Sequence, residues 1–247
     1  MSKRTFLSAQ WEYLAMFNYE IDPNILEKHI PSGTEIDFFN GKAIVSIVGF
    51  LFNNTKVMGI KWPGHVNFEE ANLRYYIKRY DGEKWKRGVG FVSEIVPKPL
   101  VTIMANLLYN EHYSTACMNH RITKTENELE LEYSWQRRKQ YKNIIKVSAA
   151  PLSVEIEPGS EEEFIFEHYF GYNQLSASSI IEYAVHHPRW ETFPVKDYLI
   201  DCDIENLYGK EFVPFITGKK PHSVFLAKGS KVTVEKPTKI VTTLIKQ

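Results

Sequence analysis

Hydrophobic and polar residues alternate along most of this chain with the two-residue period of β-strands. Glu128–Trp135 is the clearest case, because its leucines and aromatic residues fall on one face and its glutamates on the other. Lys42–Phe52 and Gly88–Val96 are apolar at both parities, which indicates strands covered on both faces, although Glu94 interrupts the second of them. Further segments of strand character bring the expected number to about nine: VNFEEANLRYYIKR, NIIKVSA, EEFIFEHYFGY, SSIIEYAVHH, KDYLIDCD and SKVTVEKP.

Helical signals are few. Asp22–Pro31 carries an acidic cap and a proline stop, and Pro97–Asn110 has a proline near its start followed by apolar residues at helical spacing. One or two short helices are expected in IENLYGKEFVPFIT. Many short strands without βαβ alternation predict one mainly antiparallel domain over residues 1–247, in the mainly β (α+β) class. A closed or half-closed barrel with a few packed helices explains the doubly apolar strands better than a flat sheet.

Composition narrows the range of partners. The 247 residues include 30 basic and 30 acidic side chains, so the basic excess of a nucleic-acid-binding protein is missing. No apolar run reaches the roughly 18 residues of a membrane helix, and Gln10 and Glu12 interrupt any signal-peptide core. Cys117 and Cys202 lack the spacing of a zinc or redox site and are expected to be reduced and buried, which favours the cytoplasm. Without a phosphate-binding glycine loop, a serine elbow or a metal motif, no cofactor and no metal site are expected.

The segment Val66–Arg79 places two carboxylates side by side at the start of a strand. Glu69 shares the face of an apolar row, whereas Glu70, Asn72 and Arg74 follow one another on the opposite face, about 6.7 Å apart. If this second face lines a hollow barrel, an acid, an amide and a guanidinium at that spacing can hold a small polar ligand, and Arg74 can clamp a carboxylate. The alternative leaves Glu69 in an ion pair at the strand end and the Glu70 row in water. The sequence does not decide which face is inside, so Glu69 stays a candidate ligand-binding residue together with Asn72 and Arg74.

Other polar side chains offer candidate chemistry. Lys98 stands between two prolines at the start of a helix, where the positive end of the helix dipole disfavours an ammonium by roughly 0.3–1 kcal/mol, so a neutral nucleophilic amine is a candidate beside an ordinary surface lysine. His168, Tyr172 and Trp190 combine an apolar body with a polar tip and are candidate pocket walls. The histidines lack the spacing of metal ligands, and a structural role is favoured for them over metal binding.

Five segments resemble the YqjF-like family of uncharacterised bacterial proteins over nearly the whole chain: FLSAQWEYLAMFNYEIDP, VNFEEANLRYYIKR, EHYFGYNQ, EYAVHHPRWETFPV and PHSVFLAKGSKVTVEKP. That family is similar in fold to acetoacetate decarboxylase, a cone-shaped antiparallel barrel with a buried pocket. The resemblance implies a pocket position for Glu70, which matches an aromatic-x-Glu pattern. It also implies a Schiff-base role for Lys98, because GFVSEIVPKP matches a Gly-x6-Pro-Lys pattern.

The chain departs from the decarboxylase pattern at three places. Pro99 replaces the second lysine that lowers the pKa of the nucleophile. No arginine stands near Trp11 to hold a substrate carboxylate, and Val92 replaces a glutamate. Decarboxylation of a β-keto acid in the strict sense is therefore not expected.

Three hypotheses remain open. The first is carbonyl chemistry on a small oxo compound through Lys98, with Glu70 orienting the substrate or moving protons. The second is a non-catalytic barrel that binds a small hydrophobic or aromatic molecule, for which the 14% aromatic content speaks. The third is an interaction or structural module whose barrel is packed solid. Whether the chain forms a homo-oligomer is also left open.

Overall fold

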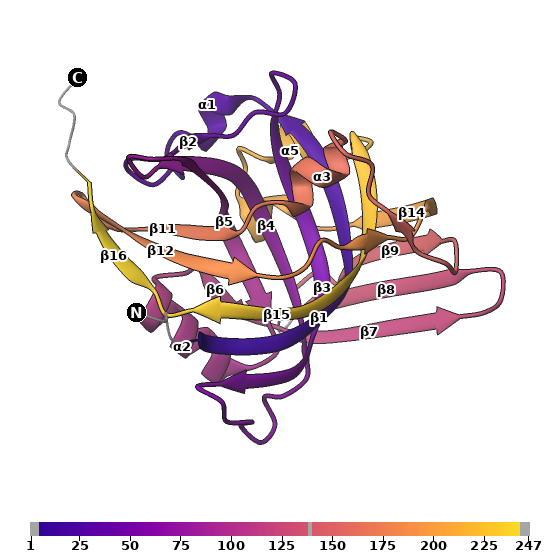
Figure 1. Cartoon of the computed structure of the whole chain (residues 1–247). Coiled ribbons are helices and arrows are strands. Elements are labelled where there is room, and N and C mark those ends of the chain that lie inside the picture. Colours follow the sequence, from indigo (N-terminus) through magenta and orange to yellow (C-terminus); the bar gives the residue numbers. More distant parts are fainter. Residues whose placement is uncertain (1–4, 138–139, 243–247) are drawn as a thin grey trace.

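The computed structural model describes residues 5–137 and 140–242, and most of these residues lie in two β-sheets (Figure 1). The larger sheet contains β1 (Thr5–Ile21), β2 (Glu35–Ile36), β3 (Ala43–Val57), β4 (Phe68–Tyr80), β5 (Trp85–Val96), β6 (Tyr113–Thr115), β10 (Val154–Glu155), β11 (Phe170–Ser176), β12 (Ser179–His186), β13 (Glu191–Thr192), β15 (Ser223–Glu235) and β16 (Thr238–Val241). The smaller sheet contains β7 (Cys117–Lys124), β8 (Leu129–Gln136), β9 (Asn143–Ala149) and β14 (Val195–Asp201).

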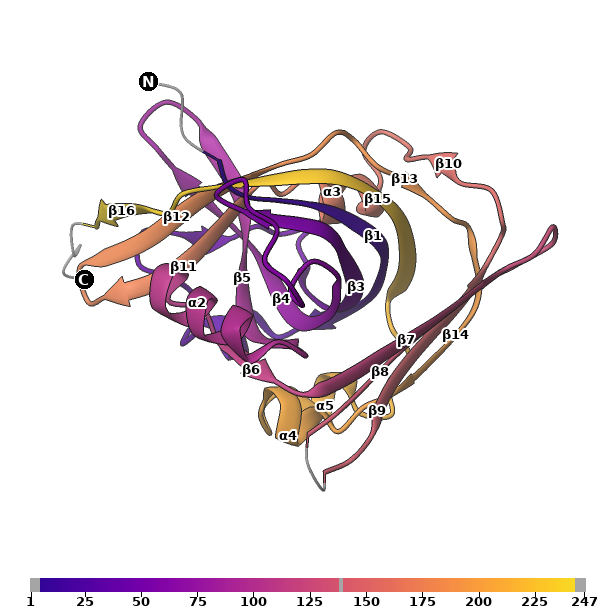
Figure 2. The ribbon, with the colours of Figure 1, turned by 90° about the horizontal axis from the view of Figure 1, so that it is seen from below.

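The larger sheet curls into a cone. Its strands follow the order β15–β1–β3–β4–β5–β11–β12, and β12 then meets β15 again at Val185–Val234 and His186–Thr233. Because the two ends of the sheet join over only two residue pairs, the barrel is a tapered curl, which Figure 2 shows from below. Nearly all neighbours are antiparallel, the exceptions being β5 with β6 and β5 with β11. The predicted mainly β cone is confirmed.

The smaller sheet covers the outer face of β1, β3 and β4. Alternate residues of these strands, such as Phe17, Ile47 and Leu73, share one buried cluster with Tyr133 and Ile145 of the smaller sheet. The approach is close at Gly49, where a Cβ atom would lie 2.7 Å from Cδ1 of Ile145 and 2.9 Å from a ring carbon of Tyr133. Strands that are apolar at both parities therefore have the interior of the cone on one face and the second sheet on the other. Helices had been expected to cover the outer face.

The inner face of the cone carries a second cluster of buried residues, including Val48, Phe50 and Tyr76. The two clusters use opposite parities of the same strands. The strand period thus separates a packed layer outside the cone from a wall inside it.

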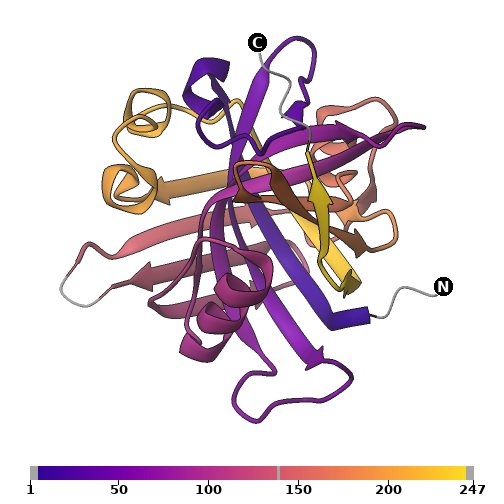
Figure 3. The same cartoon turned by 90° about the vertical axis from the view of Figure 1, so that its left-hand side faces the viewer.

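Five helices lie in the described part of the chain: α1 (Pro23–Leu26), α2 (Pro99–Tyr109), α3 (Glu161–Phe166), α4 (Ile204–Tyr208) and α5 (Val213–Ile216). Asp22 caps α1 as expected, since its side chain accepts a hydrogen bond from the backbone N–H of Asn24. Helix α2 begins at Pro99 and ends at Tyr109, and its C-cap residue Asn110 adopts a left-handed conformation. Figure 3 shows α1 and α2 at opposite ends of the curl.

Some expectations need correction. The described residues form 16 strand segments instead of about nine, and the long strand β1 was not expected from its sequence. Cys117 is exposed and not buried. None of the helices in the described ranges has the length and apolarity needed to cross a bilayer. The single domain over 1–247 and the cytoplasmic location stay predictions.

Candidate functional site

A cavity of about 740 Å³ fills the interior of the cone. Its walls are mostly aromatic and aliphatic, with Trp11, Phe50 and Phe52 among them. Polar side chains of the inward row of β4 reach it at two places. This combination of apolar walls and a few converging polar groups is typical of small-molecule sites.

The alternation along β4 sends its two adjacent glutamates in opposite directions. Glu69 lies on the outer face, where Oε1 is 2.6 Å from Nδ1 of His120 in the smaller sheet. Glu70, Asn72 and Arg74 line the cavity. The apolar row that shares its parity with Glu69 therefore packs between the sheets, and the mixed row faces the hollow interior.

Glu70 belongs to a group of three buried carboxyls, Glu70, Glu94 and Glu111, which we call the glutamate cluster. The three residues are 3%, 2% and 8% exposed and all line the cavity. They come from β4, β5 and the turn after α2. Side-chain hydrogen bonding joins Glu94 to Glu111. Because like charges repel, two carboxyls in such contact resist ionising together.

Neighbouring amides and phenols complete the glutamate cluster. Asn72 Nδ2 donates to Oε1 of Glu70 at 2.9 Å, and the Tyr113 hydroxyl donates to Oε2 of Glu70 at 2.8 Å. The Tyr183 hydroxyl donates to Oε1 of Glu111 at 2.6 Å. The phenolic protons of both tyrosines are therefore directed at carboxyl oxygens.

Burial governs the protonation of the glutamate cluster. It raises the pKa of Glu70 to about 7, against the hydrogen bonds from Asn72 and Tyr113 and with the help of repulsion from Glu111. Burial, followed by repulsion from the other two carboxyls, raises the pKa of Glu94 well above its ordinary value. The pKa of Glu111 is also raised by burial, against hydrogen bonds that include that of Tyr183. Each carboxyl is thus held closer to its neutral form.

Arg74 supplies the second polar place, which we call the basic end. Its Nε donates to the Tyr76 hydroxyl at 3.1 Å, and its Nη2 donates to the Ile165 carbonyl at 3.1 Å and approaches Met16 Sδ at 3.4 Å. Within the described ranges no carboxylate forms an ion pair with this guanidinium. A half-buried positive charge therefore faces the cavity without a counter-ion among those residues.

His168 lies at the basic end and is oriented by a carboxylate behind it. Its Nε2 is 3.1 Å from Oδ2 of Asp37, which also receives the Arg87 guanidinium at 2.6 Å. Burial lowers the pKa of His168 to about 4, so the ring is neutral and its proton sits on Nε2 facing Asp37. Nδ1 is then a bare acceptor, and no described residue donates to it. Burial opposes ionisation of Asp37, but the hydrogen bonds from His168 and Arg87 hold its pKa at about 2.

Comparison with known proteins identifies the family of this chain. Residues 8–231 match DUF2071, described as an uncharacterized conserved protein. The chain belongs to the DUF2071 family. It is similar to the uncharacterized protein YqjF of Bacillus subtilis (strain 168), with 26% identity over 181 residues that cover 72% of each chain. The expected resemblance to the YqjF-like family is confirmed.

Solved structures confirm the similarity in fold to acetoacetate decarboxylase. The enduracididine biosynthesis enzyme MppR with HEPES buffer bound has a TM-score of 0.65 and 11% identity, covering 98% of this chain and 89% of its own. The same enzyme complexed with pyruvate has a TM-score of 0.61 and 11% identity, covering 98% and 91%. An acetoacetate decarboxylase-like enzyme from Sphingomonas wittichii RW1 has a TM-score of 0.64 and 10% identity, covering 96% and 94%. At these identities the likeness shows the shared fold.

The cavity of this DUF2071 protein contains some of the predicted site residues and not others, and the predicted ligand-binding residue Glu69 is not among its lining residues. His168 and Trp190 line it with Glu70, Asn72 and Arg74, and Trp190 stacks on His187 with ring centroids 4.0 Å apart. Tyr172 is fully buried in the layer outside the cone, where its hydroxyl donates to the Lys86 carbonyl at 3.3 Å.

Lys98, the predicted catalytic amine, is not among the lining residues. It is the half-buried N-cap of α2, with extended backbone, and its side chain makes no capping hydrogen bond. Leu100 and Val101, the second and third residues of the helix, do line the cavity. The structure therefore brings Glu70 to the cavity wall without Lys98.

The sequence alone did not assign several residues of this site to the cavity, because the pattern around each of them is weak. Glu94 was visible as the carboxylate that breaks an apolar strand. Glu111 and Tyr113 stand in a short polar stretch after a helix, where such residues are ordinary, and Tyr183 is one aromatic residue in an aromatic strand. Their convergence depends on tertiary structure.

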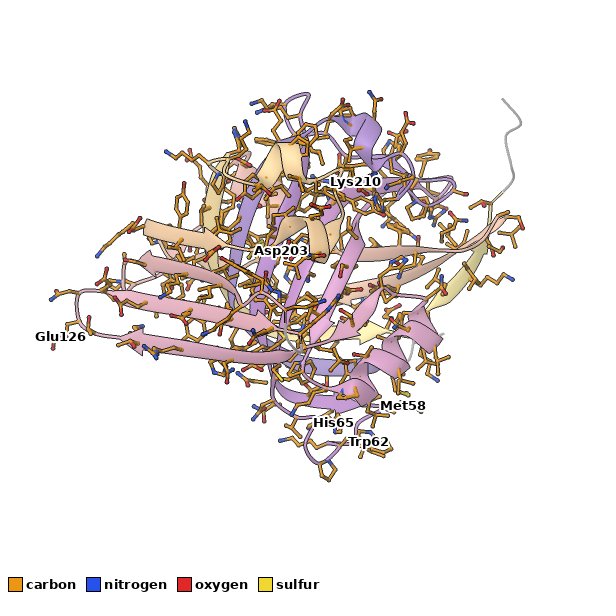
Figure 4. All side chains as sticks on the ribbon, turned by 180° about the vertical axis from the view of Figure 1, so that it is seen from behind. Met58, Trp62, His65, Glu126, Asp203 and Lys210 are labelled. Atoms are coloured by element: carbon orange, nitrogen blue, oxygen red, sulfur yellow. The ribbon has the colours of Figure 1, made fainter. Side chains whose placement is uncertain are left out.

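Exposed apolar residues surround the opening of the cavity. Met58 and Trp62 lie in the loop between β3 and β4, close to α2 (Figure 4), and they line the cavity together with Leu100 and Met104 of that helix. All four are exposed. The apolar face of α2 was recognised from its spacing, but it borders the opening and is not buried in a core.

Proposed function

We propose that this protein binds one small, mainly apolar or aromatic molecule with an anionic group inside the cone. The observation that carries the proposal is the cavity of about 740 Å³ with the unpaired Arg74 guanidinium in its wall. Pockets of 300–1,000 Å³ with apolar walls commonly enclose molecules of this kind. A barrel packed solid is incompatible with such a volume.

The contacts of Arg74 support an anionic group. Its Nε and Nη2 atoms are held by Tyr76 and Ile165, while Nη1 donates to no described residue. The fork is therefore fixed in place with one nitrogen free, and fixed guanidinium forks suit carboxylates. MppR, a protein of the same fold, has been solved in complex with pyruvate, which is itself a small carboxylate.

Thermal-shift and calorimetric binding measurements test this function. Phenylbutanoate is expected to stabilise the protein and to bind more tightly than phenylbutanol, because only the carboxylate pairs with Arg74. Arg74→Met should remove this preference, whereas Arg121→Met, an exposed position on the smaller sheet, should leave it unchanged. Equal binding of the acid and the alcohol to the wild type would refute the anionic group. Failure of every member of a broad aromatic panel to bind would refute the function.

Schiff-base chemistry at Lys98 stays a prediction. Borohydride reduction in the presence of pyruvate and larger oxo acids should leave a mass adduct on Lys98 if the amine condenses with a carbonyl. The Lys98→Arg variant provides the control, since it keeps the charge and cannot form the adduct. A broad carbonyl panel that never labels Lys98 would end this hypothesis and leave the binding function untouched.

A further inference from the structure

The glutamate cluster has more hydrogen-bond acceptors than its surroundings satisfy. Oδ1 of Asn72 is buried and has no partner among the described residues. Oε2 of Glu94 and Oε2 of Glu111 are also buried and receive no N–H or phenol hydroxyl there, because these two carboxyls interact with each other. Asn72 is 3% exposed and lines the cavity. Leaving buried acceptors unpaired costs about 1–3 kcal/mol each, so a bound group that donates to them gains correspondingly.

The phenol and amide donors already present are engaged elsewhere. The Tyr113 and Tyr183 hydroxyls donate to Glu70 and Glu111, and Asn72 Nδ2 donates to Glu70. The Asn72 amide oxygen cannot donate in any protonation state. The free capacity at this end of the cavity therefore calls for a group with several N–H donors.

The charge of the glutamate cluster also favours a ligand group with N–H donors. No Lys, Arg or His in the described ranges forms an ion pair with a member of the glutamate cluster, although three carboxyls are buried together. No set of three carboxyl, His or Cys side chains in those ranges is arranged to hold a metal ion. An ammonium, with three N–H donors and a positive charge, matches both the acceptors and the missing charge.

We propose that the glutamate cluster and Asn72 bind the primary ammonium group of the molecule that occupies the cavity. The proposal rests on the proposed function, since it names a second group on the ligand of the same cavity. Along β4, Glu70 and Arg74 are two same-face steps apart, roughly 13 Å. The ligand is therefore an elongated amine with an apolar or aromatic body, and its anionic group lies at the opposite end from its ammonium.

Three probes of one shape separate this inference from the proposed function. They are phenylbutylamine, phenylbutanol and phenylbutanoate, each titrated calorimetrically into the full-length protein. The amine should bind at least about tenfold more tightly than the alcohol, because only the ammonium supplies a charge-assisted donor for every free acceptor. Glu94→Gln and Glu111→Gln should each reduce this preference about tenfold or more and leave the affinity for phenylbutanoate within about threefold.

A matched control and distinct outcomes keep the two ideas apart. Glu69→Gln removes the neighbouring carboxylate on the outer face and should leave the amine preference intact. If phenylbutanoate binds through Arg74 but the amine binds no better than the alcohol, the ammonium site is refuted and the proposed function stands. If the amine preference survives in both Glu94→Gln and Glu111→Gln, the ammonium site is also refuted. If the amine depends on these glutamates while phenylbutanoate does not bind, the anionic group is refuted and the ammonium site stands.

Discussion

The two ends of the cavity both bury carboxyl groups, yet their protonation is shifted in opposite directions. Asp37, behind the basic end, has a pKa of about 2, because hydrogen bonds from His168 and Arg87 outweigh its burial. Glu70, in the glutamate cluster, has a pKa of about 7, because burial outweighs hydrogen bonds from neutral groups. The partner, more than the depth, decides the charge of a buried acid. The glutamate cluster lacks a cation and Arg74 lacks a carboxylate among the described residues, so a ligand can complete both ends.

One strand contributes side chains to both ends. The inward row of β4 contributes Glu70 and Asn72 at the glutamate cluster, and Arg74 and Tyr76 at the basic end. Because this row is fixed by the strand register, the two ends cannot approach each other. The separation of charge inside the cavity is therefore a property of the fold, and substitutions at either end should act independently.

The largest effect is expected from Asp37→Asn. Removing this charge leaves the Arg87 guanidinium and the oriented His168 without their partner, and we expect a loss of about 3 kcal/mol of unfolding free energy at pH 7. Because the pKa of Asp37 is depressed in the folded state, its contribution is present above about pH 4 and is lost as the pH falls through about 2. Urea denaturation between pH 7 and pH 2 measures both the loss and its disappearance in acid.

Asp22→Asn is the matched control for Asp37→Asn. Asp22 is an exposed helix cap, and asparagine caps helices about equally well, so its stability should change by less than about 0.5 kcal/mol. An equal loss in both variants would show that the ion pairs of Asp37 contribute nothing particular.

Glu70→Gln should act in the opposite direction at high pH. The folded state holds a proton on Glu70 between about pH 4.5 and 7 that the unfolded chain has released, so wild-type stability falls as the pH rises through this window. The raised pKa of Glu70 corresponds to about 3 kcal/mol of unfolding free energy lost by the wild type at high pH. The glutamine side chain of the variant loses about 1 kcal/mol of hydrogen bonding. The variant should therefore be about 2 kcal/mol more stable than the wild type at pH 9 and slightly less stable at pH 4.

Glu69→Gln offers the adjacent control for this change. Its carboxylate lies outside the cavity against His120, so the variant should gain no alkaline stability. Chemical denaturation at pH 4, 7 and 9 distinguishes the two neighbours. A Glu70→Gln variant that loses stability at pH 9 would show that Glu70 is ionised without penalty in the folded protein.

The sequence predicted the two rows of β4 but could not orient them. An apolar row and a mixed row are both compatible with an inner or an outer position when each face of a strand is covered, and the cover of the apolar row comes from β7, β8, β9 and β14, far along the chain. Glu94 was recognisable because a carboxylate is costly in an apolar strand. Glu111 was not recognisable, because its burial arises only where the turn after α2 folds against β5 and β12.

Lys98 shows the limit of a short motif. The Pro-Lys pattern predicts a residue at the start of a helix, and the structure has a helix that begins at Pro99. Whether the side chain at that point enters the cavity depends on how the helix is set against the barrel, which a local pattern does not encode. For Glu70 the motif-based prediction agrees with the observed lining of the cavity, because the alternation of side chains along a strand fixes the direction of this residue.

The smallest expected effect concerns the distance over which the charge of Arg74 influences the pKa values of other groups. This guanidinium contributes to the lowered pKa of His168 and also to that of His187, after burial in both cases. Arg74→Met, which keeps the length and apolar packing of the side chain, should therefore raise both histidine pKa values slightly, as measured by NMR titration. The pKa of Glu70 should stay where it is, because its shift arises from burial, from Asn72 and Tyr113, and from Glu111. If Glu70 moves as much as His168, the two ends share one electrostatic field, and a ligand's ammonium and anionic group would then bind with coupled and not additive energies.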